Sequence, residues 1–436
     1  MTTETKDSGV KWIGIVPANW EINKIKYIAV LKGRIGWQGL TSDEYTDEGA
    51  YLITGVDFEN GGINWDSCVH VPMRRWEEAR DIQIEDGDLL ITKDGTIGKV
   101  AIVSGCTAPT SLNSGVLRVS TIDGYDRRFL YWVLQSDVFW TWFADKNAGN
   151  STIQHLYQGD FAEFKYAIPP IDEQRAIADF LDAECAKIDN IIDDLERQIE
   201  VLKKHRRSII TETVTKGLNK NTPLHDSGNP YVGEIATDAQ AIRFKYVASI
   251  DADLVDPAKY ADMPQVSPEN IVSNTGELVD IRTVEEVGVD SWNQRFFTGQ
   301  IIYSKIRPAL NKVTIAPFNG LCSADMYPIS TKLPTRYLMY FMLSDAFVSQ
   351  TIEVSSIRVK MPKVNQEELK NFIVVTHPQD AMLQIAEYLD ERCEIIDAVL
   401  RQKRMQQDTM QRQKQSLIYE YVTGKKRVKE VTSHAD

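Results

Sequence analysis

The architecture of this chain is decided by the stretch IADFLDAECAKIDN at residues 177–190, which returns as IAEYLDERCEIIDA at residues 385–398. The two stretches lie 208 residues apart and agree at most of their apolar positions. In the first stretch, Leu181, Cys185 and Ile188 follow one another at steps of four and three, the heptad pattern of a coiled coil. We therefore predict two long helices that are copies of one another.

Each predicted helix carries a seam of apolar residues at heptad positions, and the first seam is more continuous than the second. The seam residues are Leu181, Cys185, Ile188, Ile192, Leu195, Ile199 and Leu202 in the first helix and Leu389, Cys393, Ile396 and Leu400 in the second. Arg206 interrupts the first seam, and the second becomes mixed from Lys403 onward, with Lys414 at a further seam position. One interpretation is a solvated second helix. We favour pairing of the two helices with each other, antiparallel, which would place the preceding domains at opposite ends.

The repetition extends outward from the helices to most of the chain. Asp7-Ser8-Gly9 and Lys26-Tyr27 return 219 residues later as Asp226-Ser227-Gly228 and Lys245-Tyr246. Farther along, Lys93 returns as Lys305 at an offset of 212, and the offset is 208 from residue 129 into the helix. The order of matches is kept while the offset drifts, so we predict an internal duplication with length changes only in its globular part.

The duplication predicts an α+β fold with a pseudo-two-fold internal repeat. Mixed strands and helices form two globular domains, which alternate with two long helices that pair as an antiparallel coiled coil. The predicted segments are a first globular domain at 1–168, a central helix at 169–218, a linker and first segment of repeat 2 at 219–242, a second globular domain at 243–377, and a C-terminal helix with a basic tail at 378–436.

Composition limits the classes of function. Of the 436 residues, 43% are hydrophobic and 25% are charged, as in ordinary globular proteins, and no export signal or membrane-spanning run is present. The five cysteines and six histidines are scattered, so we expect reduced thiols, a cytoplasmic protein and no metal site. The net charge of −13 argues against tight nucleic-acid binding, unless basic residues cluster on one surface or a partner protein supplies part of the contact with the nucleic acid.

The globular parts contain short β-branched runs that predict strands at 88–92, 99–103 and 115–119, with counterparts at 300–304 and 312–316. Aromatic residues at near-helical spacing in 126–143 and 336–348 predict buried helices, rather than a platform for stacked bases. Between the first two strands, residues 93–99 resemble a phosphate loop. Lys93 and Val100, however, stand where a Walker loop needs glycine and Ser or Thr, so nucleotide binding is rejected.

What remains is a polar hairpin with a lysine at the same place in both copies, which suits a phosphate or base contact; a solvated turn is the alternative. A second polar loop precedes each helix, at 147–154 and 355–360, and its residue types suit base edges in the major groove. The candidate DNA-binding residues are Lys93, Asp94, Thr96, Lys99, Asn150, Ser151, Thr152, Gln154, Lys305, Arg307, Asn311, Lys312, Arg358 and Lys360.

The usual catalytic motifs are missing. The sequence has no Gly-rich dinucleotide fingerprint, no Gly-x-Ser-x-Gly, no HExxH and no Asp/Asn-Pro-Pro-Tyr. We therefore expect a DNA-reading scaffold without catalytic residues. Two alternatives are a coiled-coil protein-interaction adaptor without DNA specificity, and an enzyme whose site forms where the two halves meet.

The whole chain resembles the specificity subunit of type I restriction–modification systems. The motifs that carry this resemblance are Trp12-Ile13-Gly14-Ile15-Val16-Pro17 with Trp20, the hairpin from Gly87-Asp88 to Gly95-Thr96-Ile97-Gly98-Lys99-Val100, and Ile168-Pro169-Pro170 with Glu173-Gln174, Ile177 and Phe180-Leu181. Copy two departs from the pattern, since residues 305–312 lack the Gly-Thr-Ile-Gly turn and Thr376-His377-Pro378 replaces the Pro-Pro motif.

The resemblance implies two target-recognition domains that each read one half of a split site in double-stranded DNA, with the helices setting their spacing. It also implies assembly with two methyltransferase subunits that use S-adenosylmethionine, and with restriction/translocase subunits that use ATP and Mg. No cofactor is expected in this chain, and no membrane partner.

Overall fold

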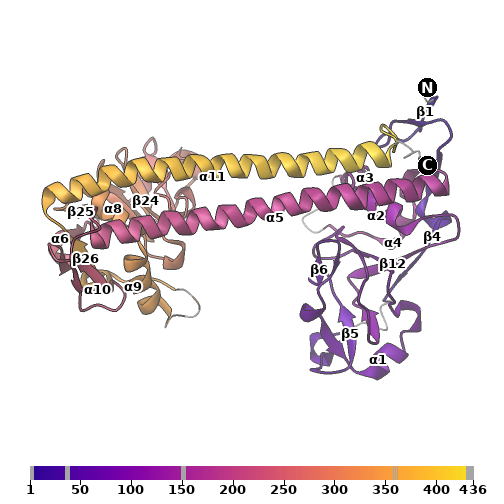
Figure 1. The fold of residues 1–436 in the computed structure, drawn as a ribbon, viewed down its shortest axis with the longest axis horizontal. Helices are drawn as coiled ribbons and strands as arrows, with labels where there is room; N and C mark the ends of the chain where they lie inside the picture. The colour runs from indigo at the N-terminus through magenta and orange to yellow at the C-terminus, as the bar shows by residue number, and fades with distance from the viewer. Residues whose placement is uncertain are drawn as a thin grey trace. The chain divides into compact units, whose positions relative to one another are not determined.

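The computed structural model describes residues 4–34, 40–148, 154–356, 358, 360 and 362–428. The chain divides into two compact units (Figure 1). Unit 1 comprises Met1–Asp194 and Gln406–Asp436, and unit 2 comprises Leu195–Met405. The two long helices, α5 (Ile171–Lys216) and α11 (Gln379–Val422), therefore each contribute one part to unit 1 and one part to unit 2.

Unit 1 is built on a four-stranded antiparallel sheet in the order β10-β9-β12-β4. A second sheet has the order β11-β5-β8, and β11 runs parallel to β5. The strands are β1 (Thr5–Asp7), β2 (Ile15–Pro17), β3 (Glu21–Lys24), β4 (Ala29–Gly33), β5 (Ala50–Ile53), β6 (Phe58–Glu59), β7 (Gly62–Ile63), β8 (Val69–Val71), β9 (Leu89–Thr92), β10 (Val100–Ile102), β11 (Thr110–Leu112), β12 (Val116–Thr121) and β13 (Lys165–Ile168). The short helices are α1 (Met73–Glu77), α2 (Arg127–Gln135), α3 (Asp137–Lys146) and α4 (Gln158–Ala162).

Unit 2 repeats this plan. Its four-stranded sheet has the order β17-β25-β22-β23, and a five-stranded sheet has the order β18-β21-β24-β19-β20. The strands are β14 (Leu224–Asp226), β15 (Glu234–Ala236), β16 (Gln240–Arg243), β17 (Ala248–Ile250), β18 (Leu254–Val255), β19 (Pro264–Val266), β20 (Arg282–Thr283), β21 (Asn293–Phe296), β22 (Ile301–Ser304), β23 (Val313–Ile315), β24 (Gly320–Ser323), β25 (Met326–Thr331) and β26 (Ile373–Thr376). The short helices are α6 (Phe244–Val247), α7 (Val284–Val287), α8 (Thr335–Leu343), α9 (Asp345–Ser356) and α10 (Gln366–Asn371).

The two units share a strand order, which confirms the predicted duplication. β4, β9, β10 and β12 correspond in sequence to β17, β22, β23 and β25, and both sheets connect them in the same order. In both units a strand of the second sheet pairs in parallel, β11 with β5 and β24 with β19. That second sheet has three strands in unit 1 and five in unit 2, so it is where the copies diverged most.

Each unit has a core that continues into its helix pair. In unit 1, Ile177 and Leu181 of α5 and Ile418 and Val422 of α11 belong to the main buried cluster. In unit 2, the equivalent cluster takes Ile210 and Val214 from α5 together with Ile385, Leu389 and Cys393 from α11. The apolar stripe that the heptad pattern predicted is thus buried against both the other helix and the globular part.

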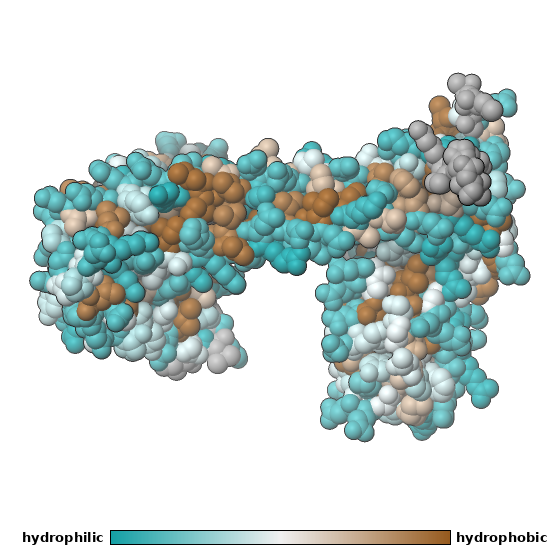
Figure 2. Space-filling model, viewed as in Figure 1, coloured by the Kyte–Doolittle hydropathy of each residue, from teal (hydrophilic) through white to brown (hydrophobic). Residues whose placement is uncertain are grey.

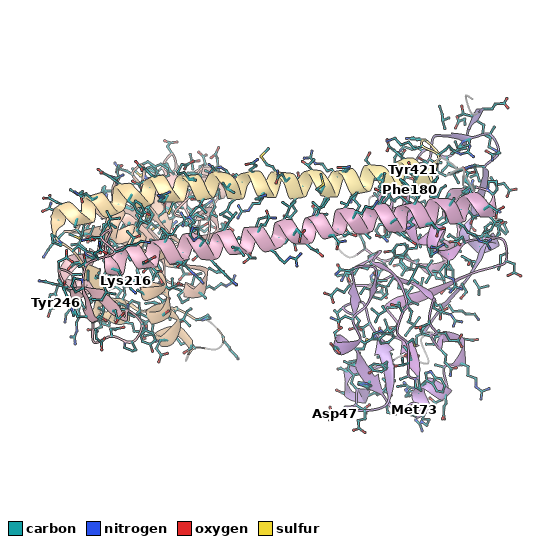
Figure 3. All side chains as sticks on the ribbon, in the orientation of Figure 1. Asp47, Met73, Phe180, Lys216, Tyr246 and Tyr421 are labelled. Atoms are coloured by element: carbon teal, nitrogen blue, oxygen red, sulfur yellow. The ribbon has the colours of Figure 1, made fainter. Side chains whose placement is uncertain are left out.

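The helices run antiparallel within each unit, as predicted. In unit 1, the rings of Phe180 and Tyr421 lie with their centroids 4.4 Å apart (Figure 3), and Asp189 pairs with Lys414. Residue numbers therefore rise along α5 as they fall along α11. In unit 2, Ile199 packs with Ile396 and Leu400. The predicted seam residues of α11 are all buried, as are those of α5 except Ile192 and Leu202, which are half-buried.

The aromatic stretch at 126–143 differs from the prediction in one respect. It forms two helices, α2 and α3, because the hydroxyl of Ser136 accepts a hydrogen bond from the amide of Val138 and starts a second helix. In copy two, α8 and α9 meet at Ser344 in the same way. The aromatic residues Phe129, Trp132, Phe139 and Trp142 are buried, as predicted, whereas Trp140 is 40% exposed.

Four of the five cysteines are buried, and none forms a disulfide. Burial raises the pKa of the Cys68, Cys185 and Cys322 thiols to about 12 and that of Cys393 to about 11, so these thiols stay protonated. Figure 2 shows a mostly hydrophilic surface with apolar groups along the long helices. Across the part of the chain that is described, no helix combines the length and the apolar character needed to cross a bilayer.

Candidate nucleic-acid interface

The predicted hairpin of copy one is formed by the antiparallel strands β9 and β10. Its loop is closed by backbone hydrogen bonds from the amide of Thr92 to the Lys99 carbonyl and from the amide of Gly98 to the Thr92 carbonyl, both 2.9 Å. The Thr92 hydroxyl lies inside the turn, where it donates to the Thr96 carbonyl and accepts from the Lys99 amide. These bonds give the loop one defined conformation.

Gly98 has no substitute in this turn. Its φ is +77°, and a Cβ at this position would lie 2.5 Å from the Cη2 atom of Trp140. The indole of Trp140 therefore packs directly on the hairpin backbone. The sequence motif Gly-Thr-Ile-Gly is thus required partly by the turn and partly by this contact.

The residues that directly follow the second polar loop of copy one lie against the hairpin. The amide of Leu156 donates to the Lys93 carbonyl at 3.0 Å, and Nδ1 of His155 lies 2.7 Å from Oδ1 of Asp94. The candidate residue Gln154, next to His155, is exposed. Asn150, Ser151 and Thr152 fall outside the described residues. The described end of the second loop thus adjoins the hairpin that the sequence predicted separately.

The side chains of this surface differ in their partners. Lys99 donates to the Phe58 carbonyl at 3.4 Å, and the Thr96 hydroxyl donates to the Gly55 carbonyl at 3.3 Å. Asp94 is held by His155, and both side chains are about two-fifths exposed, at 43% and 41%. Among the described atoms, the half-buried Lys93 side chain has no hydrogen-bonding or ion-pairing partner.

A hollow of about 300 Å³ lies beside the hairpin. It is lined by Phe58, Asn60, Gly61, Gly98, Lys99, Val100, Gln135 and Trp140. An exposed indole, two amides and a lysine around one hollow can stack on a flat ring and donate hydrogen bonds to its edge. The sequence analysis missed Trp140 and His155, since the aromatic run predicted a core and a lone histidine carries no pattern.

The hairpin of copy two uses different residues for the same connection. The amide of Ser304 donates to the Lys312 carbonyl at 2.9 Å, as Thr92 does to Lys99. The intervening loop contains a short 3-10 turn, Pro308–Leu310, flanked by Arg307 and Asn311 at φ of +46° and +43°. A left-handed conformation is common for asparagine and uncommon for arginine. Copy two therefore replaces two glycines with a proline turn.

The second loop of copy two also lies against its hairpin. The amide of Val364 donates to the Lys305 carbonyl at 2.9 Å, which is the counterpart of the bond from Leu156 to Lys93. The amide of Arg307 donates to the Pro362 carbonyl, also at 2.9 Å, and Ile306 forms a β-bridge with Lys363. The juxtaposition of the two loops is thus a shared property of both copies.

Several candidate cations of copy two are engaged inside their own domain. Lys305 donates to the Ala324 carbonyl at 2.8 Å, and Lys312 donates to the Pro268 carbonyl at 2.6 Å. Arg358 pairs with Glu368, which raises the pKa of the guanidinium. Arg307 and Lys360 are exposed.

Asn311 is the unusual member of the set. It is 1% exposed, and neither its Nδ2 nor its Oδ1 atom has a hydrogen-bond partner. A buried amide without partners is costly, by about 1–3 kcal/mol. Its main chain is fixed, because its carbonyl accepts from the Asn274 amide at 3.1 Å and its own amide donates to the Pro308 carbonyl.

The arrangement offers hydrogen bonding and positive charge. Among the described residues, no group of three or more His, Cys, Asp or Glu side chains is placed to hold a metal ion. The fold and these surfaces define a class: a duplicated α+β protein that presents a pair of adjoining polar loops on each copy and joins the copies through long helices.

Comparison with known proteins finds similar proteins of one family. The family profile described as the type I restriction modification DNA specificity domain matches residues 17–202. The chain is 34% identical over 289 residues to the type I restriction enzyme EcoDI specificity subunit of Escherichia coli, covering 63% of this chain and 64% of that subunit. It is 24% identical over 436 residues to the MjaVIII specificity subunit of Methanocaldococcus jannaschii, covering 95% and 94% of the two chains.

A solved chain from a structural study of assembly and conformational transition in the type I R-M system has the same fold. It matches with a TM-score of 0.65 at 14% identity, over 93% of this chain and 98% of that one. The matching profile and these relatives are all of type I restriction–modification specificity subunits, and the chain is similar to them. These relatives support the predicted specificity function and give no support to the adaptor alternative.

Proposed function

We propose that each globular domain reads one half of a bipartite site in double-stranded DNA. The domain at 1–168 would read one half and the domain at 243–377 the other, and the helices would set the spacing between them. The loops that would touch DNA are the hairpin and the adjoining polar loop of each copy. Their candidate contact residues are Lys93, Asp94, Thr96, Lys99, Asn150, Ser151, Thr152, Gln154, Lys305, Arg307, Lys312, Arg358 and Lys360, whereas Asn311 is 1% exposed and would not reach DNA.

One observation carries this proposal. The bond from the Leu156 amide to the Lys93 carbonyl and the bond from the Val364 amide to the Lys305 carbonyl join the same two loops in both copies. The loops themselves differ, with glycines and Asp94 in copy one, and with Arg307 and a proline turn in copy two. A constant frame with different polar loops fits two readers of different sequences.

The same proposal assigns the chemistry to other subunits. Two methyltransferase subunits would dock on this chain and bind S-adenosylmethionine, and restriction/translocase subunits would use ATP and Mg. This chain would supply specificity and no catalytic residue, in the cytoplasm. Because its net charge is −13, the isolated chain should bind DNA weakly and with a steep salt dependence.

The test is to express the chain with its genomic neighbours and map methylated adenines. A bipartite motif with a fixed gap is expected, and the absence of methylation in every neighbour combination would contradict the proposal. Exchange of residues 10–168 for those of a relative should change one half of the motif only. A change in both halves would overturn the assignment of one domain to one half-site.

A further inference from the structure

An exposed Lys-Tyr pair stands at the same place in both copies. Lys26-Tyr27 lies in the 3-10 turn Ile25–Tyr27 before β4, and Lys245-Tyr246 lies in α6 before β17. The two tyrosines are 59% and 61% exposed, and Tyr246 is seen at the edge of its domain in Figure 3. The pair is therefore a surface feature that the duplication has kept.

The buried neighbours of the pair changed while the exposed residues did not. Ile25 and Phe244 are each 0% exposed and occupy equivalent positions just before the pair. Ile28 and Val247, just after it, are also buried and also differ. Core residues are normally the more constrained, because a change in volume is felt in a packed interior. Here the packing tolerated substitution, and the surface pair stayed identical.

The geometry of the pair is reproduced as well as its identity. Lys26 Nζ lies 5.1 Å from the centroid of the Tyr27 ring, and Lys245 Nζ lies 5.2 Å from that of Tyr246. Equivalent backbone bonds hold both turns, from the Ile25 amide to the Phe164 carbonyl and from the Phe244 amide to the Phe372 carbonyl. The lysine covers its tyrosine from one side, and so each copy presents the same preformed element.

No other large exposed apolar side chain shares this property among the described residues. Trp140 is replaced by the buried Val348, Ile191 by Val399, and Val201 by Thr409. At these three positions the exposed apolar side chain is not matched in the other copy. Retention of Tyr27 and Tyr246 alone points to a constraint from outside the chain.

We propose that Lys26-Tyr27 and Lys245-Tyr246 are two equivalent docking points for two copies of one protein partner. The inference rests on the proposed function, under which that partner is the methyltransferase subunit. In copy one, Glu163 lies 2.6 Å from Lys26 and 2.6 Å from Lys24, and these lysines lower the pKa of Glu163 to about 2. This ionised carboxylate disfavours a phosphate at the copy-one pair, so a protein fits better there than DNA; copy two has Asn371 at the equivalent position.

The place of the pair in unit 2 supports the same partner. Figure 1 shows α6 and α9 on different sides of the domain, and the last two residues of α9 begin the polar stretch 355–360 that we propose for DNA. Tyrosine is enriched at the energetic centres of protein interfaces, where its flat ring fills a pocket and its hydroxyl reaches a polar group. Each docking point therefore takes one subunit.

The experiment measures how many methyltransferase subunits bind this chain. The full-length chain is co-expressed with the methyltransferase subunit encoded beside it, and complexes are counted by native mass spectrometry. Tyr27→Ala and Tyr246→Ala should each shift the complex from two bound subunits toward one, with at least tenfold weaker binding at the altered copy. The double variant should lose both, while Tyr27→Phe and Tyr246→Phe should keep most binding.

Matched controls separate this role from general surface effects. Tyr157→Ala and Trp292→Ala remove side chains that are 62% and 61% exposed but have no identical counterpart in the other copy, and they should leave two subunits bound. Unchanged circular dichroism would show that each variant folds.

Three results would overturn the inference. If the alanine variants still bind two subunits with wild-type affinity, the docking points are wrong and the proposed function stands. If the wild-type chain binds no methyltransferase subunit, the proposed function fails and the inference fails with it. If the variants keep two subunits but lose binding to a DNA duplex, the pair contacts DNA instead.

Discussion

Arg206 of α5 and Asp397 of α11 form a buried ion pair in unit 2, with Arg206 Nε 2.9 Å from Asp397 Oδ1. The equivalent residues of the other copy lie 208 positions away, Lys414 for Arg206 and Asp189 for Asp397. They also form an ion pair, in unit 1 and at 2.7 Å, but here the cation is on α11 and the aspartate is on α5. The cation that interrupts each predicted seam therefore meets the aspartate of the opposite helix. The duplication has preserved a cross-helix contact in both directions, and the two pairs differ in burial.

Arg206→Ala should destabilise unit 2 by about 3 kcal/mol, because removal of one member leaves the other charge poorly paired. Its side chain is 7% exposed, and it also donates to the carbonyls of Asn274 and Thr275. The free energy of unfolding in urea measures this change. Lys414→Ala is the matched control; it should cost under about 1 kcal/mol, because that pair is more exposed. Equal losses would show that burial does not set the difference.

Ile199→Asp should disrupt the helix pair more than Ile192→Asp. Ile199 is 6% exposed and packs with Ile396 and Leu400, so aspartate there would be a buried, unpaired charge costing about 3 kcal/mol or more. Ile192 is half-buried, and water can reach a charge at its position. Thermal melting monitored by circular dichroism at 222 nm compares them. Wild-type stability of Ile199→Asp would mean that this seam is not packed in solution.

The stability of unit 2 should fall as pH drops below about 6.5. Burial of His377 lowers the pKa of its imidazole, whose Nε2 lies 3.1 Å from the Val214 carbonyl. The folded-state pKa is thus below the unfolded value, so the unfolded chain binds the proton first. His377→Gln should flatten the dependence of the melting temperature on pH between 7.5 and 5.5. His225→Gln, at an exposed position, should leave the slope as it is.

Gly98→Ala should impair reading of one half-site, whereas Gly95→Ala should not. Both glycines have positive φ, +77° and +71°, so both variants carry backbone strain of about 1 kcal/mol. Only at Gly98 does the added Cβ meet Trp140; at Gly95 no described atom lies within 4 Å. Methylation of duplexes that vary in one half-site measures the difference. Equal effects of the two variants would mean that strain alone matters.

Lys93→Ala should weaken DNA binding without a change in melting temperature, and should lower the salt slope of binding by about one phosphate contact. Lys305→Ala should behave differently, because this lysine donates to the Ala324 carbonyl and lies 3.6 Å from Asp325. Its loss should lower the melting temperature. Fluorescence anisotropy of the assembled complex across a salt series, with calorimetry, tests both; a destabilised Lys93→Ala would assign that residue a structural role.

The sequence predicted the parts of the fold that depend on periodicity. The heptad steps from Leu181 onward located both long helices, and the repeat offsets located the matching strands, because both signals survive substitution within a residue class. The break at Ser136 was missed, since a capping hydroxyl inside an aromatic run leaves the helical spacing nearly intact. Half-burial of Ile192 was also missed, because a heptad pattern does not say how closely two helices approach.

For the candidate interface, the sequence predicted two separate polar loops in each copy. It did not predict that they adjoin. The contact between His155 and Asp94 joins residues that are 61 positions apart, and no local sequence pattern predicts it. Which lysines have partners among the described residues could not be predicted from the sequence either. Lys93 and Lys305 look equivalent in sequence, yet the neighbouring turn supplies a carbonyl acceptor to Lys305.

The division of the long helices between units has a consequence for how the chain is made. Unit 2 is continuous in sequence, from Leu195 to Met405, whereas the core of unit 1 needs Ile418 and Val422. During synthesis on the ribosome, unit 2 can therefore fold while the first 194 residues still lack part of their hydrophobic core. The domain synthesised first is the one that finishes folding last, and until then its exposed apolar surface needs protection from aggregation.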